Sequence, residues 1–544
     1  MDIREKLSLG SSEFDEIINK NKIYVDKTDV IKKIIDLDRK YYFLSRPRRF
    51  GKSLLLNTFK ELFKGNKELF EGLYIYDNWD WNKTYPVIHL DLNNVNSESL
   101  ETFEESLNFH LNRLAKSFSI ELQAKYSNDK LLELIEEVCL KHGKPVVVLI
   151  DEYDKPILDN INNKEIAIKI QNKLGNFYGT LKSMGGSLEF VFITGITKFS
   201  KVSVFSRLNN LKDLSLNEEY STICGYTHEE LEKYFKKFIT YYGNKEDIGY
   251  YGTVKRIKRY YDGYSWDGGN FLYNPYSIMN FFDDNEFKNY WFESGTPNFL
   301  VKIFKENFNI NDVYNPVIKY EEDFTIFDIV HLEQIPLLFQ AGYLTIIKKE
   351  KKHDNIEYTL KIPNLEVERS ITKNLFDNFY GKVENNFKKN RKEILKQIKN
   401  GKCKLLSEYL KKEITTIDYN LKIRDWRYYQ TIVYFAMKAL NFNTKTEIPM
   451  FSGRMDIAIE EENNHYPFYD EKGHIVIFEI KYTQQKNKNI ETLANIAIEQ
   501  IKKKGYWEKY EGNDITIIGL AIKEIKLKIG GSKIDMICKI EKIN

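Results

Sequence analysis

The sequence contains few cysteines and carries almost no net charge, and each shortage excludes a class of protein. Its 544 residues include four cysteines, Cys139, Cys224, Cys403 and Cys538, which are far apart and form no CxxC pair. This spacing supports neither a zinc ribbon nor a disulfide framework. The eight histidines also lack metal-ligand spacing such as HExxH. Because 82 basic residues nearly balance 79 acidic ones, a polybasic tail protein is excluded, whereas a local nucleic-acid-binding patch is not.

Long apolar runs are also absent. No uncharged apolar stretch approaches the ~18 residues that a membrane-spanning helix needs. Residues 1–6 are charged and lack the apolar segment of a secretion signal. We therefore expect a cytoplasmic protein with no membrane partner. Hydrophobic residues make up 42% and charged residues 30%, which favours a folded chain, and the length suggests about three to four domain-sized units.

The first 222 residues alternate apolar strands with helical stretches. Four strands are expected, at 41–45, 86–92, 146–150 and 188–193. Apolar residues recur at helical spacing after residue 52, and further helices are expected from about residue 100 and at 166–181. This alternation favours an α/β domain with a doubly wound parallel sheet, in which the strand at 86–92 is an inserted strand.

Residues 223–400 are predicted to form a mostly helical region rich in Tyr and Phe. Thr227 and Glu230 make a capping box that begins a helix. A short helix at 331–340, followed by a hairpin of strands 343–347 and 356–362, resembles a winged helix with the turn 348–352 as its wing. We favour a solvated, lysine-rich hairpin tip for this turn, and DNA contact is the alternative.

Residues 401–544 are predicted to form a second α/β domain. A helix near 426–440 comes first. Three strands, a helix and a fourth strand follow it, at 444–448, 454–459, 474–482, 490–504 and 514–522.

A phosphate-binding loop is predicted where the first strand ends. Residues 46–53, RPRRFGKS, fit the P-loop pattern GxxxxGK[ST], except that Arg46 takes the place of the first glycine. Gly51 lets backbone N–H groups turn toward a phosphate, Lys52 would reach the β- and γ-phosphates, and Ser53 would bind Mg²⁺. The loop follows a strand and opens an amphipathic helix, whose N-terminus favours anions. The other nucleotide contacts predicted in the loop are Arg46, Arg48, Arg49 and Phe50.

The apolar strand at 146–150 ends abruptly in two acids, which is the form of a Walker B element. Asp151 would hold Mg²⁺ through water, and Glu152 would activate the attacking water. The alternative, a buried strand merely capped by acids, is disfavoured because the P-loop pattern is also present. Thr194, at the end of the fourth strand, could sense the γ-phosphate or could belong to an ordinary turn.

The three arginines of the loop, and Arg207 after the fourth strand, carry a second interpretation. Arg46, Arg48, Arg49 or Arg207 could act as an arginine finger, and a structural ion pair is the alternative for each.

A pair of carboxylates with a lysine is predicted near the C-terminus. In the strand at 474–482, Glu479 and Lys481 share one face, because strand side chains alternate. The preceding strand offers Asp456 as the partner carboxylate. This is the arrangement of a PD-(D/E)XK nuclease, in which the carboxylates bind Mg²⁺ and the lysine orients a hydroxide or stabilises charge on the phosphorane. An inactive site with the same residues is the alternative.

Three further polar residues are candidates for this site. Gln500, placed with Tyr506 on the following helix, could contact the metal-bound water or the DNA backbone. Glu447 could be an extra metal ligand. An ordinary exposed polar residue remains the alternative for each of them.

With both sites considered, the chain resembles the AAA-ATPase-like family of bacterial proteins that carry a C-terminal PD-(D/E)XK nuclease-like domain. The stretches that carry this resemblance are YVDKT (24–28), SRPRRFGKS (45–53), IDEYDK (150–155), TGITKFS (194–200), NNL (209–211), CGYT (224–227), YNPYS (273–277), QAGY (340–343), PNLEV (363–367), GRMD (453–456) and FEIK (478–481). The resemblance implies ATP binding and hydrolysis through the P-loop and Walker B residues, and metal-dependent cleavage of nucleic acid. It also implies ATP and Mg²⁺ as cofactors, and a role in phage defence, mobile elements or DNA processing. Arg46 departs from the general P-loop but suits this family's arginine-rich version.

The sequence thus predicts an ATP-regulated nuclease made of a P-loop domain (1–222), a helical, winged-helix-like region (223–400) and a nuclease-like domain (401–544). Nucleic acid is the expected partner, DNA rather than RNA. A homo-oligomer is a further expectation, because arginine fingers often come from a neighbouring subunit. The competing functions are a non-catalytic scaffold ATPase that binds nucleic acid and a nucleotide-independent interaction module.

Overall fold

A computed structural model describes most of the chain. The described residues are 3–198, 208, 210–293, 316–324, 334–352, 355–380, 387–416, 426–440, 442, 444–450, 453–461, 474–526 and 532–543. They form two compact units, and the chain passes from the first to the second between Glu368 and Arg369. The three-domain division at 222 and 400 stays a prediction.

The first unit is built on a five-stranded parallel sheet with the order β2-β3-β4-β1-β5. Its strands are β1 (Tyr41–Ser45), β2 (Val87–Asp91), β3 (Val146–Asp151), β4 (Leu188–Gly195) and β5 (Lys212–Asp213). The four predicted strands are therefore confirmed. Every residue of β1 and β3 is buried, as expected for parallel strands covered on both faces.

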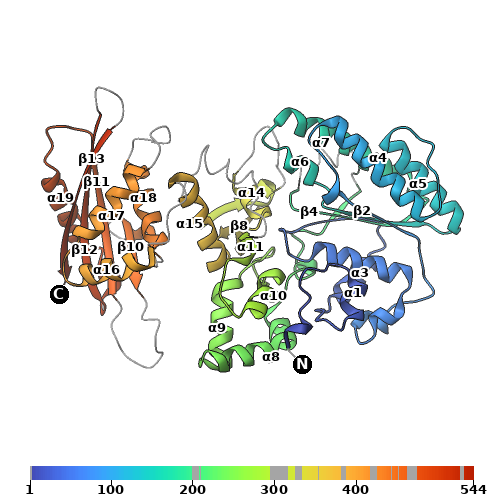
Figure 1. Ribbon diagram of the computed structural model, residues 1–544, viewed down its shortest axis with the longest axis horizontal. Coiled ribbons are helices and arrows are strands. Elements are labelled where there is room, and N and C mark those ends of the chain that lie inside the picture. The colour runs from blue at the N-terminus through green and yellow to red at the C-terminus, as the bar shows by residue number, and fades with distance from the viewer. Residues whose placement is uncertain are drawn as a thin grey trace. The chain divides into compact units, whose positions relative to one another are not determined.

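Helices cover both faces of this sheet (Figure 1). On one face are α4 (Leu100–Ser117), α5 (Ser127–His142), α6 (Lys155–Asp159) and α7 (Lys164–Ser183); on the other are α1 (Phe14–Asn19) and α3 (Lys52–Lys64). A further helix, α2 (Thr28–Ile35), precedes β1. The arrangement confirms the doubly wound α/β prediction and brings the C-terminal ends of β1, β3 and β4 to one edge of the sheet.

The rest of the first unit is mostly helical. Its helices are α8 (His228–Lys245), α9 (Gly249–Tyr261), α10 (Pro275–Asp284), α11 (Tyr290–Glu293), α14 (Gln334–Gln340) and the start of α15 (Leu365–Tyr380). The predicted capping box is present, since the Thr227 hydroxyl accepts from the Glu230 amide and the Glu230 carboxylate accepts from the Thr227 amide. Aromatic side chains such as Phe235, Tyr261 and Phe281 fill the core between α8, α9 and α10.

The predicted winged-helix order of helix and hairpin is present, but the wing is placed differently. A small antiparallel sheet has the order β6-β8-β7, with β6 (Val317–Tyr320), β7 (Thr345–Lys352) and β8 (Asn355–Lys361). Residues 348–352 extend β7 instead of forming the turn, because they pair in register with β8; the predicted turn was wrong. Lys348 pairs with Glu350 and Lys352 with Glu357, so carboxylates neutralise part of the lysine charge.

The second unit is a mixed sheet flanked by helices. The strand order is β13-β12-β11-β10-β9, with β9 (Thr444–Met450), β10 (Gly453–Glu461), β11 (His474–Thr483), β12 (Asp514–Lys526) and β13 (Ser532–Ile543). Among the described strands of this sheet, only β11 and β12 pair in parallel. The helices are α16 (Phe387–Lys399), α17 (Lys404–Thr416), α18 (Trp426–Ala439) and α19 (Ile490–Lys504). Figure 1 shows α19 on one face of the sheet and α17 and α18 on the other.

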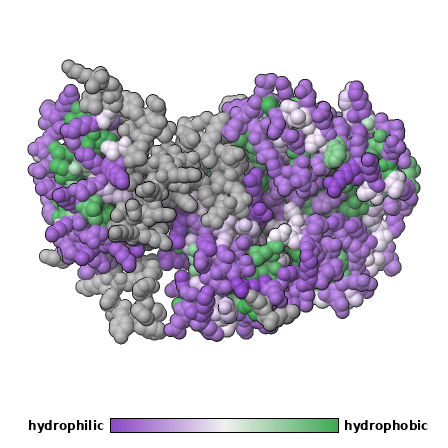
Figure 2. Space-filling model, in the orientation of Figure 1, coloured by the Kyte–Doolittle hydropathy of each residue, from purple (hydrophilic) through white to green (hydrophobic). Residues whose placement is uncertain are grey.

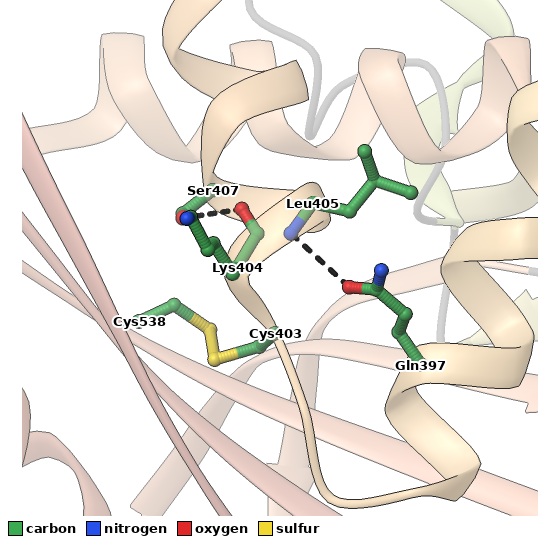
Figure 3. Close-up of a disulfide and its surroundings, with 6 residues drawn as sticks. All are labelled: Gln397, Cys403, Lys404, Leu405, Ser407 and Cys538. Carbon is green, nitrogen blue, oxygen red and sulfur yellow. Dashed lines mark hydrogen bonds between the residues drawn. A yellow bond between two sulfur atoms is a disulfide. The ribbon is translucent and has the colours of Figure 1, made fainter.

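A disulfide joins Cys403 to Cys538, which corrects the sequence-based conclusion that no disulfide framework is supported (Figure 3). Cys403 directly precedes α17, and Cys538 lies on β13. The two residues are 135 positions apart, so sequence spacing gave no sign of the pair; the fold of the second unit brings them together.

The described surface is mainly polar. In Figure 2, most of the coloured surface is hydrophilic, with hydrophobic residues in small patches. Within the described parts of the chain, every helix is too short or too polar to cross a bilayer.

Candidate functional site

The predicted P-loop connects β1 to α3. Gly51 is the residue immediately before α3 and has a φ of 97°, a left-handed conformation that favours glycine. The first amides of α3 therefore follow a tight turn, as they do in phosphate-binding loops. Ser53, in the first turn of the same helix, is half-buried.

Lys52 lies between this loop and the Walker B strand. Its side chain is buried, and its ammonium donates to the carbonyl oxygens of Arg46 (3.1 Å) and Pro47 (3.2 Å). The same nitrogen is 3.1 Å from a carboxylate oxygen of Glu152. The structure thus brings together the predicted phosphate-binding lysine and the predicted general base.

The Walker B acids meet Thr194 at the edge of the sheet. The Thr194 hydroxyl donates to Asp151 Oδ1 at 2.5 Å, and the Glu152 amide donates to the same oxygen at 3.0 Å. Asp151 and Thr194 are both buried. Glu152 has a φ of 51°, a conformation rare for a residue other than glycine and one that clusters at functional sites. Asp91, at the end of β2, lies opposite Asp151 in register, and burial together with the nearby Walker B acids raises its pKa.

These residues fit a magnesium nucleotide. Mg²⁺ prefers hard oxygen ligands, and P-loop proteins hold it with the Ser or Thr of the loop and the Walker B Asp. Ser53 and Asp151 supply a hydroxyl and a carboxylate on elements that pack against each other.

Asp154 is a site-supporting residue that sequence reasoning left without a role. It is fully buried and accepts hydrogen bonds from the amides of Ile196 (3.1 Å) and Thr197 (2.6 Å) and from the Thr197 hydroxyl (2.5 Å). Burial raises the pKa of Asp154 to about 6, and the charge of Glu152 adds to the effect. Asp154 therefore ties the segment after β3 to the end of β4. The signal available in the sequence was a third acid directly after the Walker B pair.

The Arg46 side chain is committed to a structural role. Its guanidinium is fully buried and donates to the carbonyls of Ser45 (2.8 Å) and Ser215 (2.9 Å), and more weakly to those of Tyr220 and Ser221. Burial lowers the pKa of Arg46 to about 10. The geometry does not support the predicted phosphate contact for this side chain, although its carbonyl contacts Lys52.

The remaining loop residues lie as follows. Arg48 is half-buried, Arg49 is exposed and Phe50 is fully buried. Arg207 lies outside the described residues, so its predicted role as an arginine finger stays a prediction.

A pocket opens beside the start of α3. It is lined mainly by apolar groups from the segment before α2, from α3 and from the segment before α8, including Ile23, Val25, Gly51, Leu54, Cys224 and Tyr226. Such a pocket next to a phosphate-binding loop could hold the base of a nucleotide.

The second candidate site lies on β11 and α19. Lys481 Nζ is 2.8 Å from Glu479 Oε1 and 2.5 Å from Gln500 Oε1, and the Gln500 amide also donates to Glu479 Oε1. Asp456, on the neighbouring strand β10, accepts from the Ile480 amide at 2.8 Å. The structure therefore brings Glu479, Lys481 and Gln500 together and places Asp456 on the adjacent strand.

Glu479 has the properties expected of a metal ligand. It is buried, and its Oε2 atom accepts no hydrogen bond from any described residue. Burial raises the pKa of Glu479 to about 7; the charge of Asp456 raises it further, whereas Lys481 lowers it. A buried carboxylate oxygen without a donor fits a bound cation. Among the described residues, no cluster of three or more metal-ligating side chains occurs, and the carboxylates that could hold a cation here are those of Asp456 and Glu479.

Two predicted residues of this site remain, Tyr506 and Glu447. Tyr506 follows the end of α19 instead of lying on it, since Gly505 ends the helix in a left-handed conformation; the predicted placement was wrong. Its buried hydroxyl is hydrogen bonded to Gln500. Glu447 belongs to β9, and its side chain lies outside the described residues.

Comparison with known proteins agrees with the two kinds of domain that the sequence resembles. A family model described as "Predicted AAA-ATPase" matches residues 8–205, and one described as "PD-(D/E)XK nuclease superfamily" matches residues 424–532. An "Uncharacterized protein in vnfD 5'region" from Azotobacter chroococcum mcd 1 is 32% identical over 532 residues, which cover 95% of this chain and 96% of the relative. The chain therefore belongs to the family of AAA-ATPase-like proteins that carry a C-terminal PD-(D/E)XK nuclease-superfamily domain.

Proposed function

We propose that this protein hydrolyses ATP and that its nucleotide state controls Mg²⁺-dependent cleavage of nucleic acid, DNA rather than RNA, by the C-terminal domain. The observation that carries the nuclease half is the buried Glu479 oxygen without a donor, beside Lys481 and Gln500. The observation that supports the ATPase half is the contact of Lys52 with Glu152 at the end of the Walker B strand. The proposed setting is the bacterial cytoplasm, with a role in phage defence or mobile-element biology.

In the ATPase site, each residue has a distinct task. Lys52 carries three donors, which contact two loop carbonyls and Glu152, so a phosphate oxygen can replace one of these acceptors. Once Lys52 turns to the phosphate, Glu152 is released to accept a proton from water. We propose that Arg48 and Arg49 contact the nucleotide and that Thr194 senses the γ-phosphate. The apolar pocket beside Gly51 is the proposed adenine site. A homo-oligomer would allow a neighbouring subunit to supply an arginine finger.

In the nuclease site, Lys481 is held by two partners. Glu479 and Gln500 fix its ammonium, where it would orient a hydroxide or stabilise negative charge on the phosphorane. Asp456 and Glu479 would hold Mg²⁺, which when bound would act as a Lewis acid on a phosphoryl oxygen. Burial raises the pKa of Glu479, so cation binding, which requires the ionised carboxylate, should become stronger as the pH rises.

The test is cleavage of single- and double-stranded DNA and RNA with Mg²⁺, with and without ATP. Lys481→Ala should abolish cleavage, because the ammonium that stabilises the transition state is lost, and Lys52→Ala should abolish the effect of ATP. Lys503→Ala on the exposed side of α19 is the control and should cleave as the wild type does. Equal cleavage by the wild type and Lys481→Ala would contradict the proposal. ATP hydrolysis and nucleic-acid binding without any cleavage would favour a non-catalytic scaffold ATPase.

A further inference from the structure

The P-loop is held along its length by side chains from the helical part of the same unit. At one end, the Arg46 guanidinium lies 4.0 Å from the centroid of the Trp266 ring. At the other, the Phe50 ring packs edge-on against Trp266 (5.1 Å between centroids) and Tyr264 (5.0 Å). Aromatic contacts of this kind are directional, so they fix the loop's course as well as burying it.

The three residues between these anchors have partners as well. Pro47 packs against Gly342, which has a φ of +88°; a Cβ atom there would lie 2.8 Å from Pro47 Cγ and 3.3 Å from the Trp291 ring. The Arg48 carbonyl accepts from Trp291 Nε1 at 3.1 Å, and the Arg49 guanidinium lies 5.1 Å from the Tyr276 ring. Each of residues 46–50 therefore contacts a residue between 264 and 342. We call Tyr264, Trp266, Tyr276, Trp291 and Gly342 the loop clamp.

Trp291 links the clamp to helix α15. Its backbone amide donates to Glu366 Oε1 at 2.9 Å, while its indole donates to the P-loop. Glu366 is fully buried, lies in the first turn of α15 and also accepts from the Ser277 hydroxyl at 2.8 Å. A carboxylate in the first turn of a helix is stabilised by the helix dipole, so this contact orients the start of α15.

Helix α15 connects the two units of the chain. It begins at Leu365, and the boundary between the units falls after Glu368, within its first turns. A change in the position of the Arg48 carbonyl can therefore reach the chain segment that enters the second unit through two hydrogen bonds, both made by Trp291.

We propose that the loop clamp senses the nucleotide state of the P-loop and passes it through Trp291 and Glu366 to α15. This inference rests on the proposed function, because it names the residues through which nucleotide would control the nuclease domain. Binding a phosphate requires the loop amides to face the ligand, which sets the direction of the Arg48 carbonyl. That direction decides whether the Trp291 hydrogen bond is made. Trp291 and Glu366 are positioning residues and do not touch the nucleotide.

The test is hydrogen–deuterium exchange of the full-length protein, with and without ATP and Mg²⁺. In the wild type, nucleotide should slow exchange at residues 46–52 and change it at 366–372. Trp291→Phe keeps a ring but removes the indole donor, so nucleotide should still protect 46–52 while the response at 366–372 is lost. Trp81→Phe is a matched control, since Trp81 Nε1 also donates to a backbone carbonyl, that of Tyr76, outside the clamp. An equal response at 366–372 in Trp291→Phe and the wild type, or none in the wild type despite protection at 46–52, overturns the inference.

The same experiment separates failure of the clamp from failure of the proposed function. If the wild type shows no protection of 46–52 by nucleotide, the ATPase proposal fails and the sensing of nucleotide fails with it. The coupling of the P-loop to α15 through the clamp is then judged from the nucleotide-free proteins. There, Trp291→Phe should speed exchange at both 46–50 and 366–372 by about fivefold, the effect of losing roughly one hydrogen bond, and Trp81→Phe should leave both unchanged. Unchanged exchange at 366–372 in Trp291→Phe overturns the clamp in this case.

Discussion

Asp154 shows how a single buried carboxyl group can make the first unit sensitive to pH. Its pKa is raised to about 6 by burial, whereas an ordinary Asp carboxyl has a value of 3.8. Between these values the folded protein binds more protons than the unfolded chain, so the contribution of Asp154 to stability falls as pH rises from about 4 to about 6. Above that range the group is ionised in both states and the contribution is constant.

Asp154→Asn should therefore change the pH dependence of stability. The free energy of unfolding of the wild type, minus that of the variant, should fall by about 1–3 kcal/mol between pH 4 and pH 6 and stay level above it. Chemical denaturation of both proteins across this range measures the difference. Asp159→Asn is a suitable control, since that carboxylate is exposed and makes a surface ion pair with Lys155. A wild-type-minus-variant difference that does not change with pH would contradict the prediction.

For single residues, the sequence indicated which residue types gather at the P-loop better than it indicated which atoms each of them contacts. Lys52, Glu152 and Asp151 are close together, as the motif spacing indicated. Arg46 was different, because its position in the motif suggested a phosphate, whereas its guanidinium satisfies carbonyls from residues 215–221. Those carbonyls come from a part of the chain about 170 residues away, and no local pattern reveals such a contact.

At the scale of elements, the predictions were accurate where hydrophobic periodicity or a cap was strong. The strand β1 and the helix α19 begin and end at the predicted residues. β13 was not predicted, because its many charged residues leave it without the apolar run of the buried strands; it is an edge strand whose one described neighbour is β12. The turn expected at 348–352 failed for a related reason, since strand pairing with β8 overrides the preference of a lysine run for solvent.

The disulfide between Cys403 and Cys538 ties α17 to this edge strand and closes a loop of 135 residues that contains Asp456, Glu479 and Lys481. A cross-link over so long a loop restricts the unfolded chain strongly, so Cys538→Ser should destabilise the second unit by roughly 2–5 kcal/mol. Thermal unfolding with and without a thiol reductant measures the effect, and reductant should lower the melting temperature of the wild type but not of Cys538→Ser. Cys139→Ser, at a free cysteine, is the control.

A melting temperature that responds to reductant equally in the wild type and Cys538→Ser would contradict the assigned pairing. The bond also speaks against the predicted cytoplasmic setting, because stable disulfides are uncommon in a reducing cytosol.

At the scale of the whole molecule, the sequence predicted two sites for phosphate chemistry but not the contacts that we propose to connect them. In the sequence, the two sites are separated by the helical part of the first unit. Aromatic rings from this part contact the P-loop, whereas the sequence pattern indicates only that they belong to a hydrophobic core. The roles of Trp291 and Gly342 follow from their contacts with Arg48 and Pro47. A packing contact between distant segments has no periodicity, so it is found from the structure alone.

The two ATPase-site residues that contact each other should give opposite results when they are changed separately. Lys52→Ala removes the phosphate-binding ammonium, so it should leave the protein without nucleotide. Glu152→Gln should retain ATP but slow its hydrolysis by about 10²–10⁴-fold, because the amide cannot accept the proton of water. If the ATP-bound state is the one that permits cleavage, Glu152→Gln should continue to cleave nucleic acid after the wild type has exhausted a limiting amount of ATP, and Lys52→Ala should not cleave at all.

The measurement is the time course of cleavage and of phosphate release in the same reaction, with Glu152→Gln combined with Lys481→Ala as the control without nuclease activity. Identical cleavage by Lys52→Ala and Glu152→Gln would show that the two sites act independently. Cleavage by Lys52→Ala alone would reverse the direction of control, since the nucleotide-free state would then be the permissive one. Lys52 and Glu152 lie 3.1 Å apart, so both substitutions alter the same site. A difference in cleavage between the two variants would therefore reflect whether ATP is bound.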